Sequence, residues 1–438
     1  MKQFQGQEDP TLKTNVSQNK VHTLALAFFM MALLLGSCRQ ERHIDEYLEH
    51  LPQAQWTEGT IKIDFKQPAD HNDPGGDKFT QRVVINHLDY DRPVVVELEG
   101  YNLHSKKRSE LARLLDANQV TIEHRFFAGS TPQPADWKHL NIWQAATDHH
   151  KIINALKKLY PGKWITTGFS KGGQAVMYHK RFYPDDADAS LVYVAPLLFS
   201  PEDQRIHDYL DQIGSAECRR KIRCFQEHML KNRKTFMPLF EAYTMKKDYN
   251  FPMGLERAFE LIVLEYRYAF WQWSRAICSQ IPSPDDKAKE QFDHLVKISP
   301  PALFEDQWVV DRRAFFYQAL TQTGMYSYRT APFKQYLNDT TPITFAFALT
   351  DTMTTTFDAS AMEDIYTWLR KKGNNMIYLY GEQDPWTAAA FEPSEKTSAI
   401  KLVNPDDNHK TNIGRLPWAM QDSIFTTLED WLDMEIEP

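Results

Sequence analysis

A serine between glycines, in the sequence GFSKGG at residues 168–173, is the feature of this chain best suited to chemistry. Residues 163–167, which precede it, are short and rich in β-branched side chains, and this predicts a buried strand. Residues 174–183, closed by Pro184, have the composition of a helix. A serine on such a sharp turn projects its hydroxyl above the sheet, and the glycines let strand and helix approach where a Cβ would clash. We therefore predict that Ser170 is a nucleophile.

The partners of this serine are expected further along the chain. A serine nucleophile needs a base within hydrogen-bond reach and an acid that orients the base. A strand, a Gly-x-Ser-x-Gly turn and a helix form the nucleophile elbow of α/β hydrolases, in which the acid and then the histidine follow on loops after later strands. Asp384 follows a predicted strand at residues 375–380, and His409 follows the next, at 399–403. Two competing acids, neither of which directly follows so clear a strand, are Asp351 and Asp406.

The oxyanion formed during acyl transfer needs N–H donors. A helix N-terminus directs its free N–H groups at developing negative charge, so the N–H of Lys171 is the first predicted donor. In α/β hydrolases the loop after an earlier strand supplies the second. Here that strand is expected at residues 93–98, which makes Gly100 or Tyr101 the second donor. The alternative for either residue is a plain strand-to-helix turn without a catalytic role.

The elements that must position these residues form an α/β pattern. Residues 60–65 and 79–88 predict an antiparallel hairpin, and further strands are expected at 93–98, 120–123, 163–167 and 190–195. Between them, helices are predicted at residues 109–116, 143–160 and 174–183. The predicted fold is an α/β-hydrolase fold whose core comprises residues 59–198 and 342–438.

Residues 199–341 follow a different pattern. Helical segments succeed one another without intervening strands, at 202–213, 218–229, 255–281 and 311–324. The third of these is apolar nearly all round, which predicts a buried helix. We expect a large helical cap inserted after a core strand, where it would cover the cleft and set specificity. Alternation is expected to resume near Pro342 and to end in a helix at residues 418–432.

The N-terminal 38 residues have the pattern of a signal peptide. An apolar run at residues 21–35 is too short to span a bilayer comfortably and has the length of a signal-peptide core. It ends in LGSC, which resembles the lipobox of bacterial lipoproteins, so Cys38 is the predicted lipidation site. Residues 39–58 would then form a polar tether, and the mature protein would be exported and held at a bacterial membrane. An ordinary signal peptide cleaved nearby and an uncleaved anchor are the alternatives.

Export changes the interpretation of the other cysteines. An oxidising compartment permits a disulfide, and a bond between Cys218 and Cys224 would close a short loop. Cys278 would then be free and buried, although the pairing among the three is open on sequence alone. No Cys/His spacing predicts a zinc site, and acyl transfer by a serine needs no metal or organic cofactor.

Composition restricts the functional classes. The 438 residues carry a formal net charge of −8 and no basic stripe, which argues against a nucleic-acid surface. The 26 Phe, 19 Tyr and 11 Trp suit either a large core or an aromatic cleft.

Several motifs together resemble a known family. The GFSKGG turn, the segment EHRFF at 123–127, the segment WQAATDHH at 143–150 and the loop GEQDPW at 381–386 are similar, in order, to the secreted tripeptidyl aminopeptidases of bacteria, which are related to the prolyl carboxypeptidase group. The resemblance runs from about residue 60 to the end of the chain. The lysine that follows the serine, Lys171, resembles the residue at this position in the tripeptidyl branch. The family implies a serine exopeptidase that cuts di- or tripeptides from a free N-terminus.

Recognition of a peptide's amino group requires an acid near the cleft. Glu99 and Glu123 are the candidates, each with a purely structural role as the alternative. Three other functions stay open on the same residues: a prolyl-type carboxypeptidase, an esterase or acyl hydrolase, and an inactive lipid-anchored binding protein.

Overall fold

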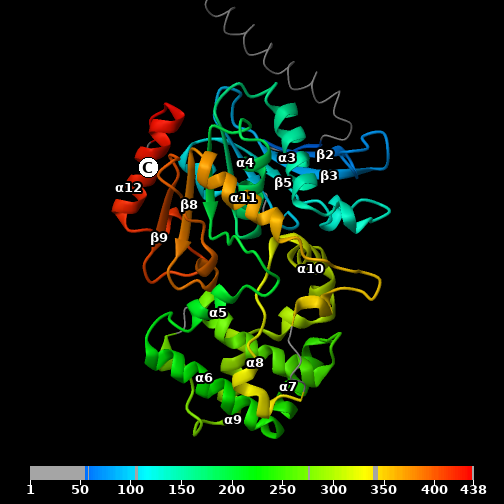
Figure 1. Ribbon diagram of the computed structural model, residues 1–438, viewed down its shortest axis with the longest axis vertical. Coiled ribbons are helices and arrows are strands. Elements are labelled where there is room, and N and C mark those ends of the chain that lie inside the picture. Colours follow the sequence, from blue (N-terminus) through cyan, green and yellow to red (C-terminus); the bar gives the residue numbers. More distant parts are fainter. Residues whose placement is uncertain (1–54, 58, 104–106, 275–276, 339–343, 437–438) are drawn as a thin grey trace, which may run out of the picture. The chain divides into compact units, whose positions relative to one another are not determined.

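The computed structural model describes residues 55–436 except 58, 104–106, 275–276 and 339–343 (Figure 1). A mixed sheet lies at the centre of this described part, with nine strands in the order β1-β2-β3-β5-β4-β6-β7-β8-β9. The strands are β1 Gln55–Thr57, β2 Thr60–Pro68, β3 Lys78–Asn86, β4 Val94–Leu98, β5 Asn118–Ile122, β6 Trp164–Phe169, β7 Ala189–Tyr193, β8 Met376–Gly381 and β9 Ile400–Asn404.

The pairing of the strands explains the sequence pattern. Strands β2 and β3 form the predicted antiparallel hairpin, and β4 to β9 run parallel. The parallel strands β4 to β8 are buried on both faces almost throughout, as expected for strands covered by helices on either side. Because the strands are parallel, the loops after β4, β6, β8 and β9 meet at one edge of the sheet. The predicted α/β-hydrolase fold is confirmed.

Two layers of helices cover the sheet (Figure 1). Helices α3, α4 and α11 pack together on one face, with α4 lying on β6 and β7. Helices α2 and α12 share a hydrophobic cluster with the other face, which includes Ile165, Leu191 and Ile377. The helices of these layers are α2 Glu110–Leu114, α3 Ile142–Leu156, α4 Lys171–Phe182, α11 Ala359–Lys372 and α12 Trp418–Leu432.

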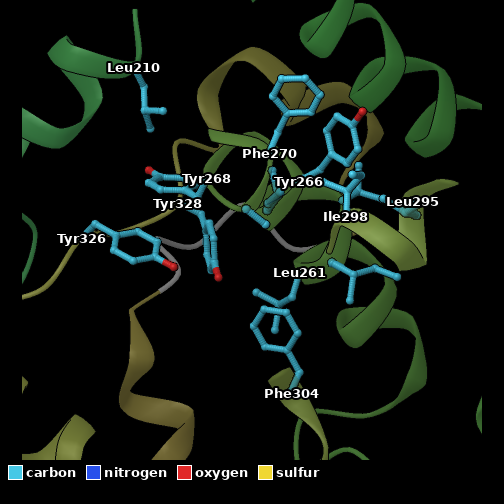
Figure 2. Packing of buried hydrophobic residues seen from close by; sticks show 14 of the residues in the cluster. Leu210, Leu261, Tyr266, Tyr268, Phe270, Leu295, Ile298, Phe304, Tyr326 and Tyr328 are labelled. Atoms are coloured by element: carbon cyan, nitrogen blue, oxygen red, sulfur yellow. The ribbon is translucent and has the colours of Figure 1, made fainter. Parts of the chain in front are cut away.

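Six helices lie between β7 and α11 in the chain, and we call them the cap. They are α5 Gln204–Leu210, α6 Ala216–Lys231, α7 Arg233–Lys247, α8 Leu255–Gln272, α9 Ala288–Ile298 and α10 Asp306–Gln318. Helix α8 is buried nearly all round, as predicted, and contacts α6, α7 and α9. Figure 2 shows its Tyr266, Tyr268 and Phe270 within the hydrophobic cluster of the cap. The cap therefore has a core of its own, built around α8.

Some elements differ from the sequence prediction. Helices α7, α9 and α11 were not predicted; α7 contains Pro238, which interrupts the usual helical signal. Helix α8 ends at Gln272, not at residue 281. After the cap, the next element of the core is α11, which is tied to α4 by an Arg181–Asp364 ion pair of 2.9 Å. The strand pattern therefore resumes at β8 and not near Pro342.

The structure settles the cysteine pairing, which the sequence left open, and the bond between Cys218 and Cys224 does not form. Cys218 is bonded to Cys278, with the two Cα atoms 5.3 Å apart. Cys218 and Cys224 both lie on α6, where a separation of six residues puts side chains on different faces of a helix. Of the described cysteines, Cys224 is the free one, and it is exposed rather than buried. The disulfide links α6 to the segment that follows α8.

The N-terminal predictions fall largely outside the described residues. The signal peptide, Cys38 and residues 39–54 of the tether are among those that the structure does not describe. The end of the predicted tether, Gln55–Thr57, is a strand that pairs with β2. Within the described part of the chain, none of the helices has the length and apolar character needed to cross a membrane.

Candidate active site

Ser170 stands on a strained turn between β6 and α4. Its backbone has φ 55° and ψ −118°, a conformation that a non-glycine residue rarely adopts. The Ser170 N–H donates to the carbonyl of Tyr193 at 2.8 Å, which continues the β6–β7 pairing into the turn. A Cβ on Gly168 would overlap the carbonyl of Gly172. The glycine is therefore required for the close approach of strand and helix, as the sequence indicated.

Ser170, His409 and Asp384 are joined by hydrogen bonds. The His409 Nε2 lies 3.0 Å from the Ser170 Oγ, and the His409 Nδ1 lies 2.5 Å from the Asp384 Oδ2. Asp384 is fully buried and His409 nearly so. If the Nδ1 proton is on the histidine, Nε2 is left as the acceptor for the serine hydroxyl. The arrangement can take a proton from Ser170 and hold the imidazolium that forms.

Loops at the carboxyl ends of strands hold the acid and the histidine. Asp384 begins the turn after β8, and its Oδ1 accepts a hydrogen bond of 3.1 Å from the Trp386 N–H. His409 follows β9, and its own N–H donates to the carbonyl of Gln272, the last residue of α8, at 3.1 Å. The ring of Trp273 lies edge-on to the His409 ring at 4.8 Å. The cap thus helps to fix the position of the histidine.

The two competing acids do not reach this histidine. Asp351 and Asp406 are both exposed. Asp406 accepts a hydrogen bond of 3.3 Å from Gln383 instead. Of the three candidate acids, the structure brings only Asp384 to His409.

The predicted oxyanion donors lie around the same turn. Lys171 is the first residue of α4, and N–H groups in the first turn of a helix have no acceptor within the helix. Gly100 is packed against this turn, since a Cβ on it would lie 2.6 Å from the nitrogen of Gly172. Tyr101 lines the cleft beside Ser170. The structure therefore places all three candidates next to the serine.

The side chain of Lys171 is buried under the turn. Its Nζ has no hydrogen-bond partner among the described residues and lies 5.5 Å from the centre of the Phe127 ring and 6.0 Å from that of Tyr101. Burial lowers the pKa of this amine well below its usual value. Burial without a polar partner among the described residues therefore disfavours the charged form of the Lys171 side chain.

A cleft between the sheet loops and the cap opens on the serine. Its empty space is about 830 Å³ when the open mouth is included. Ser170, His409 and Trp386 line it from the sheet side. From the cap and the segment after it come aromatic side chains, namely Trp273, Phe304, Trp308, Phe315, Phe316, Tyr326, Tyr328 and Phe345. The cleft can accept an elongated and largely apolar substrate.

The two acids predicted to bind an amino group do not line this cleft. Glu123 is fully buried and satisfied elsewhere: it pairs with Arg82, and it accepts bonds from the Ser130 hydroxyl at 2.6 Å and the Leu103 N–H at 3.0 Å. Its role is structural, so that prediction is wrong. Glu99 is not among the residues that line the cleft either.

The acid that does line the cleft is Glu265, on α8, which was not predicted. It is buried, and both the Tyr326 and Tyr328 hydroxyls donate to its Oε2, at 2.8 and 2.7 Å. Burial raises the pKa of Glu265 to about 7. The signal in the sequence was a carboxylate directly after the apolar run at 261–264, on a helix predicted to be buried, which is unusual because a buried acid is costly.

The fold and the site define the class of the protein: it is an α/β hydrolase in which a serine is arranged as a nucleophile. A family model described as PS-10 peptidase S37 matches residues 50–435. The chain is 33% identical, over 367 residues, to a prolyl tri/tetrapeptidyl aminopeptidase from Streptomyces mobaraensis, covering 81% of this chain and 76% of the relative. The chain belongs to the peptidase S37 family, and it is a serine peptidase.

Solved structures share only a distant likeness. The crystal structure of VinJ is 12% identical with a TM-score of 0.42, covering 85% of this chain and 98% of that one. A proline iminopeptidase from Mycobacterium smegmatis is 14% identical with a TM-score of 0.41, covering 80% and 96%. At this level neither likeness carries an argument about function.

Proposed function

We propose that this peptidase is an exopeptidase that releases di- or tripeptides from the free N-terminus of oligopeptides, with Ser170, His409 and Asp384 as its catalytic triad. The observation that carries the proposal is the hydrogen-bonded chain from Ser170 through His409 to Asp384, at the floor of a cleft, in a member of a serine peptidase family. The name of the Streptomyces relative, a tri/tetrapeptidyl aminopeptidase, supports the N-terminal polarity and, of the two proposed product lengths, the tripeptide.

The mechanism is acyl transfer through a covalent intermediate. His409 Nε2 accepts the hydroxyl proton of Ser170 as the Oγ attacks the scissile carbonyl, and Asp384 stabilises the imidazolium. The N–H of Lys171 and an N–H of the Gly100–Tyr101 turn donate to the oxyanion. His409 then protonates the departing amine, which leaves an acyl-enzyme ester on Ser170.

Water completes the cycle. His409 takes a proton from a water molecule, whose oxygen attacks the ester carbonyl. The proton returns to the Ser170 oxygen as the bond to it breaks. The products are the N-terminal di- or tripeptide and the shortened peptide, and no step requires a metal or an organic cofactor.

The triad assignment is tested with a fluorophosphonate, which phosphorylates activated serines. We expect the intact protein to gain one label, located on Ser170 by mass spectrometry of its peptides. Ser170→Ala should take up no label, lose peptide hydrolysis and melt at an unchanged temperature. Undiminished hydrolysis in Ser170→Ala would contradict the assignment.

We also propose that the protein is exported and lipid-anchored through Cys38. The apolar run at 21–35 followed by LGSC supports this, and so does the Cys218–Cys278 disulfide, because such bonds persist in oxidising compartments. Expressed in a bacterium, the wild-type chain should fractionate with membranes and carry acyl groups at Cys38. Cys38→Ser should lose both properties, and a Cys38→Ser chain that stays lipidated and membrane-bound would refute the proposal.

A further inference from the structure

A buried carboxylate in the cleft has no cation to balance it. Glu265 is the acidic side chain among the residues that line the cleft, and its described neighbours provide two tyrosine hydroxyls and no ion pair. Figure 2 shows these two tyrosines, Tyr326 and Tyr328, side by side, with ring centres 5.7 Å apart. A carboxylate removed from water and left without a positive partner is unfavourable, so this site favours a cationic ligand.

A second buried acid on the same helix shows the contrast. Glu260 is buried to the same degree, but its carboxylate binds Arg233 at 2.6 Å and Arg257 at 2.8 Å. That acid is neutralised within the protein and does not line the serine's cleft. Glu265, five residues further along α8, opens instead toward the serine's cleft. The difference separates a structural acid from one that is available to a ligand.

Helix α8 also relates Glu265 to the reacting atoms. Glu265 and Gln272 are seven residues apart, so they lie on one face of the helix, and both line the cleft. The carbonyl of Gln272 accepts the N–H of His409. Seven residues of helix rise about 10 Å. About three residues of an extended peptide span a length similar to this rise along α8, and in a tripeptidyl product three residues separate the ammonium group from the scissile carbonyl.

We propose that Glu265, held by Tyr326 and Tyr328, binds the α-ammonium group of the peptide substrate and so sets where the chain is cut. The inference rests on the proposed N-terminal exopeptidase function and assigns its specificity to a residue of the cap. The ammonium group supplies the positive charge that the described neighbours of Glu265 do not. A peptide with a blocked N-terminus would leave the carboxylate unpaired and would bind less well.

The test compares one unblocked peptide with its N-acetylated twin. The quantity is the ratio of kcat/KM for the free peptide to kcat/KM for the acetylated one, measured for purified protein. Glu265→Gln keeps the shape and removes the charge, and we expect it to lower the ratio about 10-fold or more, as for loss of a charge-assisted hydrogen bond. Glu256→Gln, an exposed change on the same helix, should leave the ratio unaltered.

A second variant helps to distinguish loss of the Glu265 interaction from loss of the fold. Tyr328→Phe removes one hydroxyl from the carboxylate and should lower the ratio by less than Glu265→Gln does. Fluorophosphonate labelling of Ser170 and the melting temperature report whether each variant keeps its active fold. A wild-type protein that treats both peptides alike would overturn the proposed N-terminal polarity together with this inference. A wild-type preference that Glu265→Gln and Tyr328→Phe both retain would overturn this inference alone.

Discussion

The sheet and the cap contribute to the cleft in different ways. The sheet presents Ser170, Asp384 and His409 on three loops whose positions follow from parallel strands that end at one edge. The cap presents Glu265 and a wall of aromatic rings from a separate hydrophobic core. In the proposed mechanism the sheet holds the groups that react, and we assign to the cap the groups that choose the substrate. Changes in the two regions should therefore have separable effects on rate and on selectivity.

The largest effect is expected on the sheet side. Asp384→Asn should lower kcat by about 10⁴-fold, because the amide no longer holds the reactive tautomer of His409. Asp406→Asn is the matched control, since that acid is exposed and bonded to Gln383 rather than to His409. The measurement is steady-state hydrolysis of the unblocked peptide. A similar loss in both variants, or in neither, would break the assignment of the acid.

The next effect concerns the stability of the cap. Cys278→Ser opens a cross-link between residues 60 apart in the chain. The chain-entropy relation then predicts a loss of about 4 kcal/mol in the free energy of unfolding. Cys224→Ser removes an exposed free thiol and should change little. Denaturant unfolding without reductant measures both. Equal stabilities of the two variants would show that the disulfide does not constrain the cap.

Two glycines test the separation of activity from stability. Gly168→Ala forces the serine turn away from the Gly172 carbonyl, and a displacement near 1 Å should lower kcat/KM by about 10²-fold. Gly254, at the start of α8, has φ 79° and open space where a Cβ would stand. Gly254→Ala should cost about 1–3 kcal/mol of stability through backbone strain and leave kcat/KM unchanged. Full activity in Gly168→Ala would contradict the close-approach argument.

The smallest effect is a pH dependence of selectivity. Burial raises the pKa of Glu265 to about 7, so its carboxyl takes up a proton, and loses attraction for an ammonium group, as the pH falls below 7. A peptide amine loses its own charge above about pH 8. The free-to-acetylated ratio of kcat/KM should therefore be highest between these values and fall up to about 10-fold for each unit of pH below 7.

The free-to-acetylated ratio of kcat/KM separates the titration of Glu265 from that of other groups. The described side chains that face it or share its cleft and can titrate are Tyr101, Tyr326, Tyr328, Tyr268, Lys171 and His409. Changes in the reacting groups affect both peptides and cancel in the ratio. A ratio that stays constant from pH 6 to 7.5 would contradict a role for the Glu265 carboxylate.

More of the site could be predicted from the sequence on the sheet side than on the cap side. Ser170, Asp384 and His409 could be located because short apolar strands precede them, and parallel strands bring their following loops together. The pairing of Cys218 with Cys278 and the orientation of Glu265 toward the cleft could not be derived, because both depend on how the cap helices pack. Glu123 was assigned wrongly because its ion-pair partner Arg82 lies 41 residues away in the chain and meets it only in the folded structure.

The most direct test of the account is the product pattern of the wild-type protein. One unblocked peptide and its N-acetylated twin would be incubated with the purified protein and the fragments read by mass spectrometry. The account predicts di- or tripeptides from the N-terminus of the free peptide, with the acetylated twin left largely intact. Removal of C-terminal residues from both would contradict it and favour a carboxypeptidase, and cleavage of neither, with turnover of a simple ester, would favour an esterase.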